Sequence, residues 1–318
     1  MSVLVYAESV DGKFKKSTLE AVSYAKATAT KIGGTVTAVT INANDDQLNE
    51  LGKYGADKVL KTNIGSFNPT NYAQAVSQAA QNAGAKVVVV SQTYTGKSVA
   101  PRVAAKLNAG IVSGAMAVPN TDSGFSVKKS AFSNKAFAYV EMTSDVKVIM
   151  LIPNSIELTE HNLTPAIEEL AVEATDNNFT VTNTTKAEGK IILTEAELVV
   201  SAGRGMKGPE NWGMIEELAD TLGAATACSK PVSDMDWRPH NEHVGQTVIT
   251  IKPNLYIAVG IPGAIQHLAG VSASKVICVI NKDPEAPFFK NADYGIVGDA
   301  FEVVPKLIEA AKSLKASS

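Results

Sequence analysis

Apolar runs of strand length alternate with longer segments of helical spacing through the first half of the chain. Ser2–Ala7 and Thr35–Ile41 are rich in the apolar and β-branched residues that strands favour. Lys86–Val90 ends in consecutive valines, a pattern typical of a strand covered on both faces. We therefore expect strands at these three runs. The helices expected between and after them are Ser17–Ile32, Asp45–Tyr54, Pro69–Ala83 and Gly96–Leu107.

Residues with special backbone preferences mark the ends of two of these helices. Ser17 is expected to be the N-cap of the first helix, and Gly33 and Gly34 are expected to end it. Pro69 suits the first turn of the third helix, and Gly84 suits its end.

The pattern changes after Ile111, where shorter strand-like runs follow one another without intervening helices. The pair Asn134–Lys135 separates Val127–Phe132 from Ala136–Met142, which predicts a β-hairpin. The first part of the chain is thus expected to form a parallel α/β core with an antiparallel extension.

A polar segment rich in Thr and Asn, from Asn177 to Gly189, is the expected connection between two domains. After it the alternation of strands and helices restarts, which implies a second, doubly wound and mainly parallel sheet. Gly223 is expected to end the first helix of this part. The expected strands are Leu198–Ser201, Leu255–Val259, Val276–Ile280 and Gly295–Val297, and the expected helices are Pro209–Leu222, Ile261–Ala269 and Ala300–Ser313.

The predicted fold class is therefore α/β with two domains. Residues 1–185 are expected to form the N-terminal α/β domain, and residues 190–318 the C-terminal domain with the doubly wound parallel sheet. A chain of 318 residues is long for one domain, and its 45% hydrophobic content supplies enough apolar material for two cores.

Composition and charge narrow the class of protein. The net charge is −3 at pH 7 and Lys and Arg form no cluster, which disfavours a nucleic-acid partner. No apolar stretch approaches the roughly 18–20 residues that span a bilayer, and Met1–Tyr6 opens directly into a strand-like run without a signal or transit peptide. Cys228 and Cys278 lack a CxxC spacing, so neither a disulfide nor a metal site is expected. We expect a cytoplasmic protein without membrane insertion.

The segment Gly203–Gly208 reads GRGMKG between an expected strand and an expected helix, which is the GxGxxG spacing of dinucleotide-binding loops. Glycines there permit a tight turn, and Arg204 and Lys207 add positive charge. The acidic ribose ligand expected about 20 residues further on is missing, because the segment Ala224–Thr226 stands there. This argues against an ordinary NAD site. The alternative interpretation is a glycine-rich turn with two solvated cations.

Two further segments offer polar groups to a ligand. Val244–Thr247 reads VGQT, and its amide and hydroxyl groups both donate and accept, so they suit either a flavin edge or the loop's own backbone. Gly260–Gly270 is expected to place Gln266 and His267 in the first turns of a helix beside a loop of Gly and Pro.

Asn281 and Asp299 follow expected strands, at the edge where ligands of open parallel sheets bind. Asp299 also suits the N-cap of the last helix. His240 and His243 are spaced like metal ligands, but no other His or Cys lies near them in sequence, so we expect no metal site. No catalytic triad or acid–base pair stands out, and we expect no catalytic residue.

Taken together, these segments resemble the C-terminal domain of electron-transfer flavoprotein alpha subunits. The resemblance runs from about Val199 to the end and is carried by SAGRGMKGPEN, VGQT, LYIAVG, GAIQHLAG, INKDPEAPFF and ADYGIVGD. The N-terminal part fits more loosely, through VLVYAE and its α/β pattern.

The resemblance implies a carrier of electrons rather than an enzyme with its own substrate, with FAD bound by the C-terminal domain. Thr247 would lie by the reactive edge of the flavin and His267 by its pyrimidine side. The positions matching the family's FAD contacts are Arg204, Ser229, Lys230, Val244, Gly245, Gln246, Thr247, Pro262, Gly263, Ala264, Ile265, Gln266, His267, Asn281, Asp299 and Ala300.

The resemblance also implies partners. A beta subunit carrying AMP or a second FAD would form a heterodimer, with the N-terminal domain building much of the contact. Dehydrogenases of the acyl-CoA type would donate electrons, and a membrane quinone reductase or similar protein would accept them, as in fatty acid beta-oxidation. Whether the protein is an ordinary or a bifurcating carrier would depend largely on the beta subunit.

Two positions depart from the family pattern. Lys230 stands where the family has Arg, and it keeps the positive charge but lacks the planar guanidinium and can lose its proton when desolvated. Pro262 stands where many members have Ser, and it removes a hydroxyl and a backbone donor. We expect the anionic semiquinone of the flavin to be less stabilised here than in relatives with Arg at this position.

Two other functions compete with this one. A nicotinamide-dependent oxidoreductase would use the GxGxxG-like loop, although the ribose acid is missing. A non-redox protein would keep the fold without the flavin, which the departures at Lys230 and Pro262 leave open.

Overall fold

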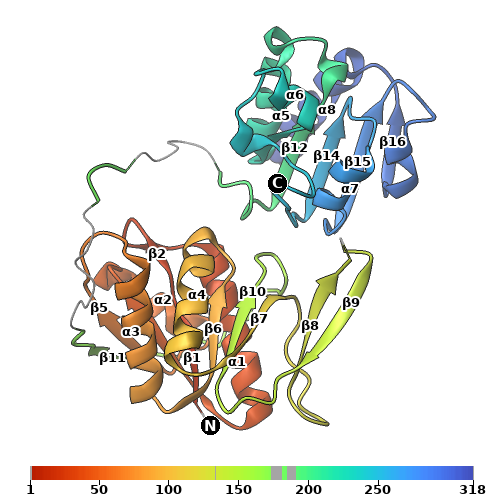
Figure 1. The fold of residues 1–318 in the computed structure, drawn as a ribbon. Coiled ribbons are helices and arrows are strands. Elements are labelled where there is room, and N and C mark those ends of the chain that lie inside the picture. The colour runs from red at the N-terminus through yellow and green to blue at the C-terminus, as the bar shows by residue number, and fades with distance from the viewer. Residues whose placement is uncertain (1, 133, 173–180, 185–190, 318) are drawn as a thin grey trace. The chain divides into compact units, whose positions relative to one another are not determined.

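The chain divides into two compact units, residues 1–186 and 187–318, each built on its own sheet (Figure 1). The computed structural model describes residues 2–132, 134–172, 181–184 and 191–317. No helix among these residues is both long enough and apolar enough to cross a membrane. Most of the expected connection between Asn177 and Gly189 lies outside the described residues.

The first unit contains, within its described residues, a nine-stranded sheet in the order β11-β5-β4-β1-β6-β10-β7-β8-β9. Neighbouring strands from β11 to β7 are parallel, and β7, β8 and β9 pair antiparallel. The predicted parallel core with an antiparallel extension is therefore confirmed. The strands are β1 (Ser2–Tyr6), β4 (Thr35–Ile41), β5 (Lys58–Thr62), β6 (Ala85–Ser91), β7 (Gly110–Ala115), β8 (Ser126–Ala131), β9 (Ala136–Glu141), β10 (Lys147–Leu151) and β11 (Ala166–Glu169).

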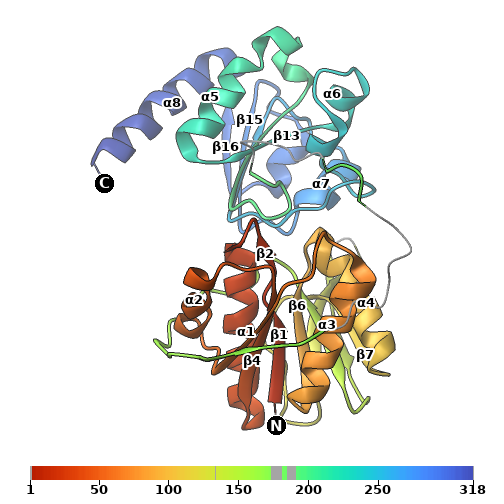
Figure 2. The same cartoon turned by 90° about the vertical axis from the view of Figure 1, so that its left-hand side faces the viewer.

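Helices cover both faces of this sheet because alternate strand residues point to opposite sides. Val3 and Val5 of β1 pack with α1 and α2, while Leu4 and Tyr6 pack with α3 and α4 (Figure 2). A short hairpin of β2 (Ser9–Val10) and β3 (Lys13–Phe14) follows β1. The helices are α1 (Lys16–Ile32), α2 (Leu48–Lys53), α3 (Pro69–Asn82) and α4 (Tyr94–Lys106).

One expected cap in this unit is wrong. Helix α1 begins at Lys16, its N-cap is Lys15, and Ser17 lies buried within the first turn. The predicted helix end is confirmed, because Gly33 takes the left-handed conformation with φ of +65°. Pro69 stands in the first turn of α3 as predicted, and Asn68 before it is the N-cap, accepting hydrogen bonds from the amides of Thr70 and Asn71.

The second unit has a five-stranded parallel sheet among its described residues, in the order β13-β12-β14-β15-β16. Numbered along the chain this is the order 2-1-3-4-5 of a doubly wound fold, as predicted. The strands are β12 (Leu198–Ala202), β13 (Ala225–Cys228), β14 (Leu255–Val259), β15 (Val276–Asn281) and β16 (Tyr294–Val297), and the helices are α5 (Gly213–Leu222), α6 (Lys230–Asp234), α7 (Ile265–Val271) and α8 (Ala300–Ser317).

Apolar side chains pack against both faces of this sheet. Ile215 of α5 and Val304 of α8 pack on one face with Val200 of β12. On the other face, Tyr256 of β14 packs with Val271 at the end of α7.

The expected helix Ile261–Ala269 starts later than predicted. Helix α7 begins only at Ile265, because Pro262 has no amide to donate and Gly263 has a φ of +90°, outside the helical region. The segment between β14 and α7 is therefore an irregular loop, and it contributes to the cleft described next.

Candidate functional site

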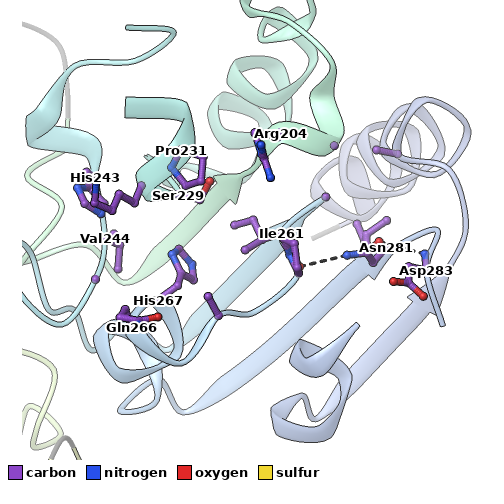
Figure 3. A pocket seen from close by; sticks show the side chains of 18 of the residues that line it. Arg204, Ser229, Pro231, His243, Val244, Ile261, Gln266, His267, Asn281 and Asp283 are labelled. Carbon is purple, nitrogen blue, oxygen red and sulfur yellow. Dashed lines mark hydrogen bonds between the residues drawn. The ribbon is translucent and has the colours of Figure 1, made fainter. Parts of the chain in front are cut away.

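A cleft of about 590 Å³ lies at the carboxyl ends of the strands of the second sheet (Figure 3). The strand order reverses between β12 and β14, which is where open parallel sheets bind their ligands. Every strand contributes a wall residue at or just after its end. These residues are Arg204 after β12, Ser229 after β13, Gly260 after β14, Asn281 at the end of β15 and Gly298 after β16.

The loops after β12 and β14 touch through their backbones at this reversal. The Gly205 amide donates to the Gly260 carbonyl over 3.2 Å, and a Cβ atom on Gly205 would lie 2.6 Å from the Gly260 Cα. Gly260 itself has a φ of +60°, which favours glycine. A side chain at Gly205 would force the two loops apart, so glycine is required for this part of the cleft.

The GxGxxG-like loop does not run straight into a helix. Two 3-10 turns, Arg204–Met206 and Pro209–Asn211, separate it from the start of α5 at Gly213. The expected helix Pro209–Leu222 therefore starts only at Gly213, and Arg204 and Lys207 on the loop supply its positive charge.

The loop of Val244–Thr247 is fixed by backbone hydrogen bonds to two other segments. The Val244 amide donates to the Cys228 carbonyl over 3.1 Å, and the Gln246 amide donates to the Gln266 carbonyl over 2.8 Å. A Cβ atom on Gly270 of α7 would lie 2.7 Å from the Gly245 Cα, so α7 and this loop also pack backbone against backbone. The exposed Gln246 and Thr247 side chains are thereby held at the cleft.

His267 lies in the wall of the cleft as a neutral side chain. Its Nε2 atom lies 2.7 Å from the Tyr256 hydroxyl, and its ring meets the Phe288 ring edge-on at 5.9 Å. Burial lowers the pKa of His267 to about 4, and repulsion from His243 adds to this, while the Val244 backbone opposes it. Its Nδ1 atom is buried, and Val244 lies near it without meeting hydrogen-bond geometry.

Cationic side chains stand at the other parts of the wall. Lys207 Nζ lies 3.9 Å from Asp299 Oδ2 and 4.6 Å from the centre of the Phe301 ring. Asp299 Oδ1 accepts a hydrogen bond of 2.9 Å from the Phe301 amide, so Asp299 caps α8 as well as lining the cleft. Both roles considered for Asp299 are thus compatible with its position.

Lys230 is the first residue of α6 and forms an ion pair with Asp234 one turn later. The pair lowers the pKa of the Asp234 carboxyl through its hydrogen bond to Lys230. The Lys230 side chain is 67% exposed, so the desolvation considered for it does not occur in this structure. Its positive charge lines the cleft but is shared with a carboxylate.

A buried ionic group holds the segment that leads into Val244–Thr247. The Arg238 guanidinium binds both oxygens of Glu242, at 2.7 and 2.8 Å, and reaches Glu216 of α5 over 2.8 Å. It also lies 5.6 Å from the centre of the Trp212 ring. Since Arg238 and Glu242 are mostly buried, their bidentate pair orients the guanidinium, and its bond to Glu216 ties the segment to α5.

The structure brings most of the residues singled out in the sequence into the wall of this one cleft. All of them line it except Gly263 and Ile265. Gly263 instead packs closely on Phe288, and Ile265 is 61% exposed at the start of α7. The wall residues outside the positions matched to the family's FAD contacts are Gly205, Lys207, Pro231, His243, Gly260, Ile261, Ile280, Lys282, Asp283 and Gly298.

Most of these further wall residues are next in sequence to the positions matched to FAD contacts, near the ends of the strands. Position directly after a strand in a doubly wound sheet is therefore the signal that would have found Gly260 and Gly298. His243 had a different signal, since it directly precedes the VGQT loop, but it was considered only as a metal ligand paired with His240, and no metal site was expected. His240 Nδ1 instead lies 2.8 Å from Ser233 Oγ. Across the described ranges, no group of three or more His, Cys, Asp or Glu is placed to hold a metal ion.

The end of β13, the second strand of this unit in chain order, tests the nicotinamide alternative. In dinucleotide folds the acidic ribose ligand follows that strand. Here β13 ends at Cys228 and Ser229 follows it, so no carboxylate stands at this position. The geometry weighs against a nicotinamide site of the ordinary kind.

Comparisons with known proteins agree over both units. Residues 192–272 match the model of the electron transfer flavoprotein FAD-binding domain, and residues 3–175 match that of the electron transfer flavoprotein domain. The chain is 38% identical to the electron transfer flavoprotein subunit alpha of Bacillus subtilis over 99% of each chain. It is 34% identical to that of Thermoanaerobacterium thermosaccharolyticum over 98% of each chain, and 36% identical to that of Syntrophomonas wolfei over 97% of this chain and 98% of the other.

Proposed function

The chain belongs to the electron transfer flavoprotein family as an alpha subunit, and we propose that it holds FAD in the cleft of its second unit and passes electrons between partner proteins. Proteins of this family are electron carriers rather than catalysts of a substrate reaction. The observation that carries the proposal is the cleft at the strand reversal, with a wall residue at the end of every strand of the sheet.

The chemistry of the cleft fits a flavin dinucleotide. The backbone contact between Gly205 and Gly260 leaves a part of the wall free of side chains, as close approach of a pyrophosphate requires. Arg204 and Lys207 supply positive charge to that part of the wall. The neutral His267 ring, hydrogen-bonded to Tyr256 through Nε2, adds a polar side chain to another part of the wall.

We infer specific roles from the positions that match the family pattern. With FAD bound, Thr247 would stand by the reactive edge of the flavin and His267 by its pyrimidine side. Bound FAD supplies the redox chemistry, and this chain's residues bind it, orient it and set the charge around it. The residues assigned to FAD are Arg204, Ser229, Lys230, Val244, Gly245, Gln246, Thr247, Pro262, Gly263, Ala264, Ile265, Gln266, His267, Asn281, Asp299 and Ala300.

We further propose that the first unit contacts a beta subunit carrying AMP or a second FAD. Supporting this, the hairpin of β8 and β9 exposes large hydrophobic side chains, with Phe132 81%, Phe137 57% and Tyr139 67% exposed. Exposed aromatic side chains grouped on one hairpin are typical of protein–protein contact sites.

The wider role proposed is that of an electron carrier between a donor and an acceptor protein. Dehydrogenases of the acyl-CoA type donate electrons and a quinone-reductase-type protein accepts them, as in fatty acid beta-oxidation. The free Cys228 and Cys278 thiols fit a reducing compartment, which supports the cytoplasm as its place of work.

Co-purification with the beta subunit tests the FAD assignment. The complex is expected to release FAD on denaturation, identified by chromatography, with at least one FAD for each alpha chain. Binding of NADH by the alpha chain, with no flavin released, would instead support the nicotinamide alternative.

A further inference from the structure

His243 is a cleft residue that neither the family pattern nor the sequence motifs assign to the flavin. Its backbone amide donates to the His240 carbonyl over 3.2 Å, and it pairs as an isolated bridge with Cys228 at the end of β13. The side chain is buried, at 6% exposure, yet it lines the cleft. Figure 3 shows it at the end of the cleft away from Asn281 and Asp283.

The His243 ring lies over the loop that we assign to the flavin. Its Nε2 atom would be 3.4 Å from a Cβ atom on Gly245. Within the part of the chain that the structure describes, neither ring nitrogen takes part in a hydrogen bond. A polar ring that is nine-tenths buried, unpartnered and in the wall of a ligand cleft points to a contact with the ligand itself.

The charged groups around His243 come from three elements. Lys230 and Asp234 of α6 act in opposite directions on it, His240 stands three residues before it, and His267 of α7 is coupled to it electrostatically. Burial is the largest influence and lowers the pKa of His243 below its usual 6.5. The ring is therefore largely neutral at pH 7, with Lys230 and His240 adding to the effect of burial and Asp234 opposing it.

We propose that His243 is a further binding residue of the cleft and that it takes up a proton when the bound flavin gains negative charge. The inference rests on the proposed function. Negative charge brought close to a buried imidazole favours the imidazolium form, so reduction raises the pKa of the ring. The donor protein supplies the electron, solvent supplies the proton, and both are returned when the electron passes to the acceptor.

This coupling has a defined dependence on pH. Between the lower pKa of His243 with oxidised flavin and the higher pKa with reduced flavin, each electron gained brings one proton. The equilibrium constant for one-electron reduction then falls by up to tenfold for each unit of pH, which corresponds to about 59 mV. At pH values above or below this window, His243 adds nothing to the dependence of the flavin potential on pH.

The test compares the potentials of bound FAD across pH in the alpha–beta complex for the wild type, His243→Gln and His240→Gln. Gln keeps a polar side chain without a titrating group. His240 is the matched control, because it is exposed and bound to Ser233 outside the cleft wall. We expect His240→Gln to keep the wild-type slope of potential against pH, with the window displaced only by loss of the His240 influence. We expect His243→Gln to lose the extra slope.

Parallel curves for all three proteins would overturn the inference, as would loss of the extra slope in His240→Gln alone. If the wild type itself holds no FAD, the proposed function fails rather than this inference. A second measurement covers a His243→Gln variant that does not fold. NMR titration of labelled histidines in the wild-type complex should show a His243 pKa at least one unit higher with reduced than with oxidised flavin, and equal values would contradict the proposal.

Discussion

The Tyr256 hydroxyl lies 2.7 Å from His267 Nε2, and both side chains are buried, Tyr256 on β14 beneath the cleft and His267 on α7 in its wall. Burial raises the pKa of the Tyr256 phenol well above its usual value, so this group keeps its proton and cannot act as a base. The pair links the centre of the sheet to the residue that we assign to the pyrimidine side of the flavin.

Replacing Tyr256 with Phe is expected to destabilise the protein by about 1–3 kcal/mol, because it leaves His267 Nε2 buried without a partner. Tyr24→Phe is the matched control, since Tyr24 is equally buried and its hydroxyl makes no hydrogen bond among the described residues. Thermal unfolding of both variants checks this. Equal losses of stability would show that the hydrogen bond between Tyr256 and His267 contributes nothing specific.

Stability is expected to fall as the pH is lowered from about 6.5 towards 4. The pKa of His267 is about 4 in the folded chain and near 6.5 when unfolded, so between these values the unfolded state binds more protons. The full difference amounts to about 3 kcal/mol. Denaturant unfolding at several pH values should show a shallower dependence for His267→Gln than for the wild type. Identical slopes would mean that His267 is not held neutral by burial.

Gly205→Ala is expected to weaken FAD binding and stability by about 1–3 kcal/mol, because its Cβ atom would overlap the Gly260 backbone. Gly213→Ala is the control, since nothing lies within 4 Å of a Cβ atom there and Gly213 begins α5. That change should be neutral or slightly stabilising. Fluorescence titration with FAD measures the affinity of both variants, and thermal unfolding measures their stability. An unaltered affinity in Gly205→Ala would show that the two loops can separate without cost.

Lys230→Met and Asp234→Asn are expected to shift the potential of bound FAD in opposite directions. Loss of the Lys230 charge disfavours reduction, whereas loss of the Asp234 charge leaves Lys230 free to favour it. Since the pair is largely exposed, shifts on the order of tens of millivolts are expected. Lys230→Arg additionally tests whether a planar guanidinium changes the gap between the two one-electron potentials. Shifts of the same sign in the first two variants would exclude this account of Lys230.

Regular elements were predictable wherever the apolar pattern was unbroken. Thr35–Ile41 and Leu255–Val259 were expected as strands and have the same bounds in the structure. The strand Ala225–Cys228 escaped notice because Ala and Thr give it little hydrophobic signal. The start of α7 was misjudged because Pro262 and Gly263 override an apolar pattern that continues through them.

Asn281 and Asp299 were predictable from their position at the ends of expected strands. Ser229 follows the strand that was missed, and it was found only through the resemblance to the family pattern. The contacts that hold the loops of the site were not predictable. Arg238 reaches Glu216 on another element, and Gly205 touches Gly260 across the sheet. Pairs of this kind depend on how distant segments meet in the fold, and no local pattern encodes them.

Stepwise anaerobic reduction of the complex with the beta subunit, followed in the visible spectrum, tests the central claim most directly. The account predicts flavin absorbance that bleaches as electrons are added and returns when an oxidised acceptor is mixed in, while FAD remains bound to the protein. A colourless complex that takes up no added FAD would contradict it.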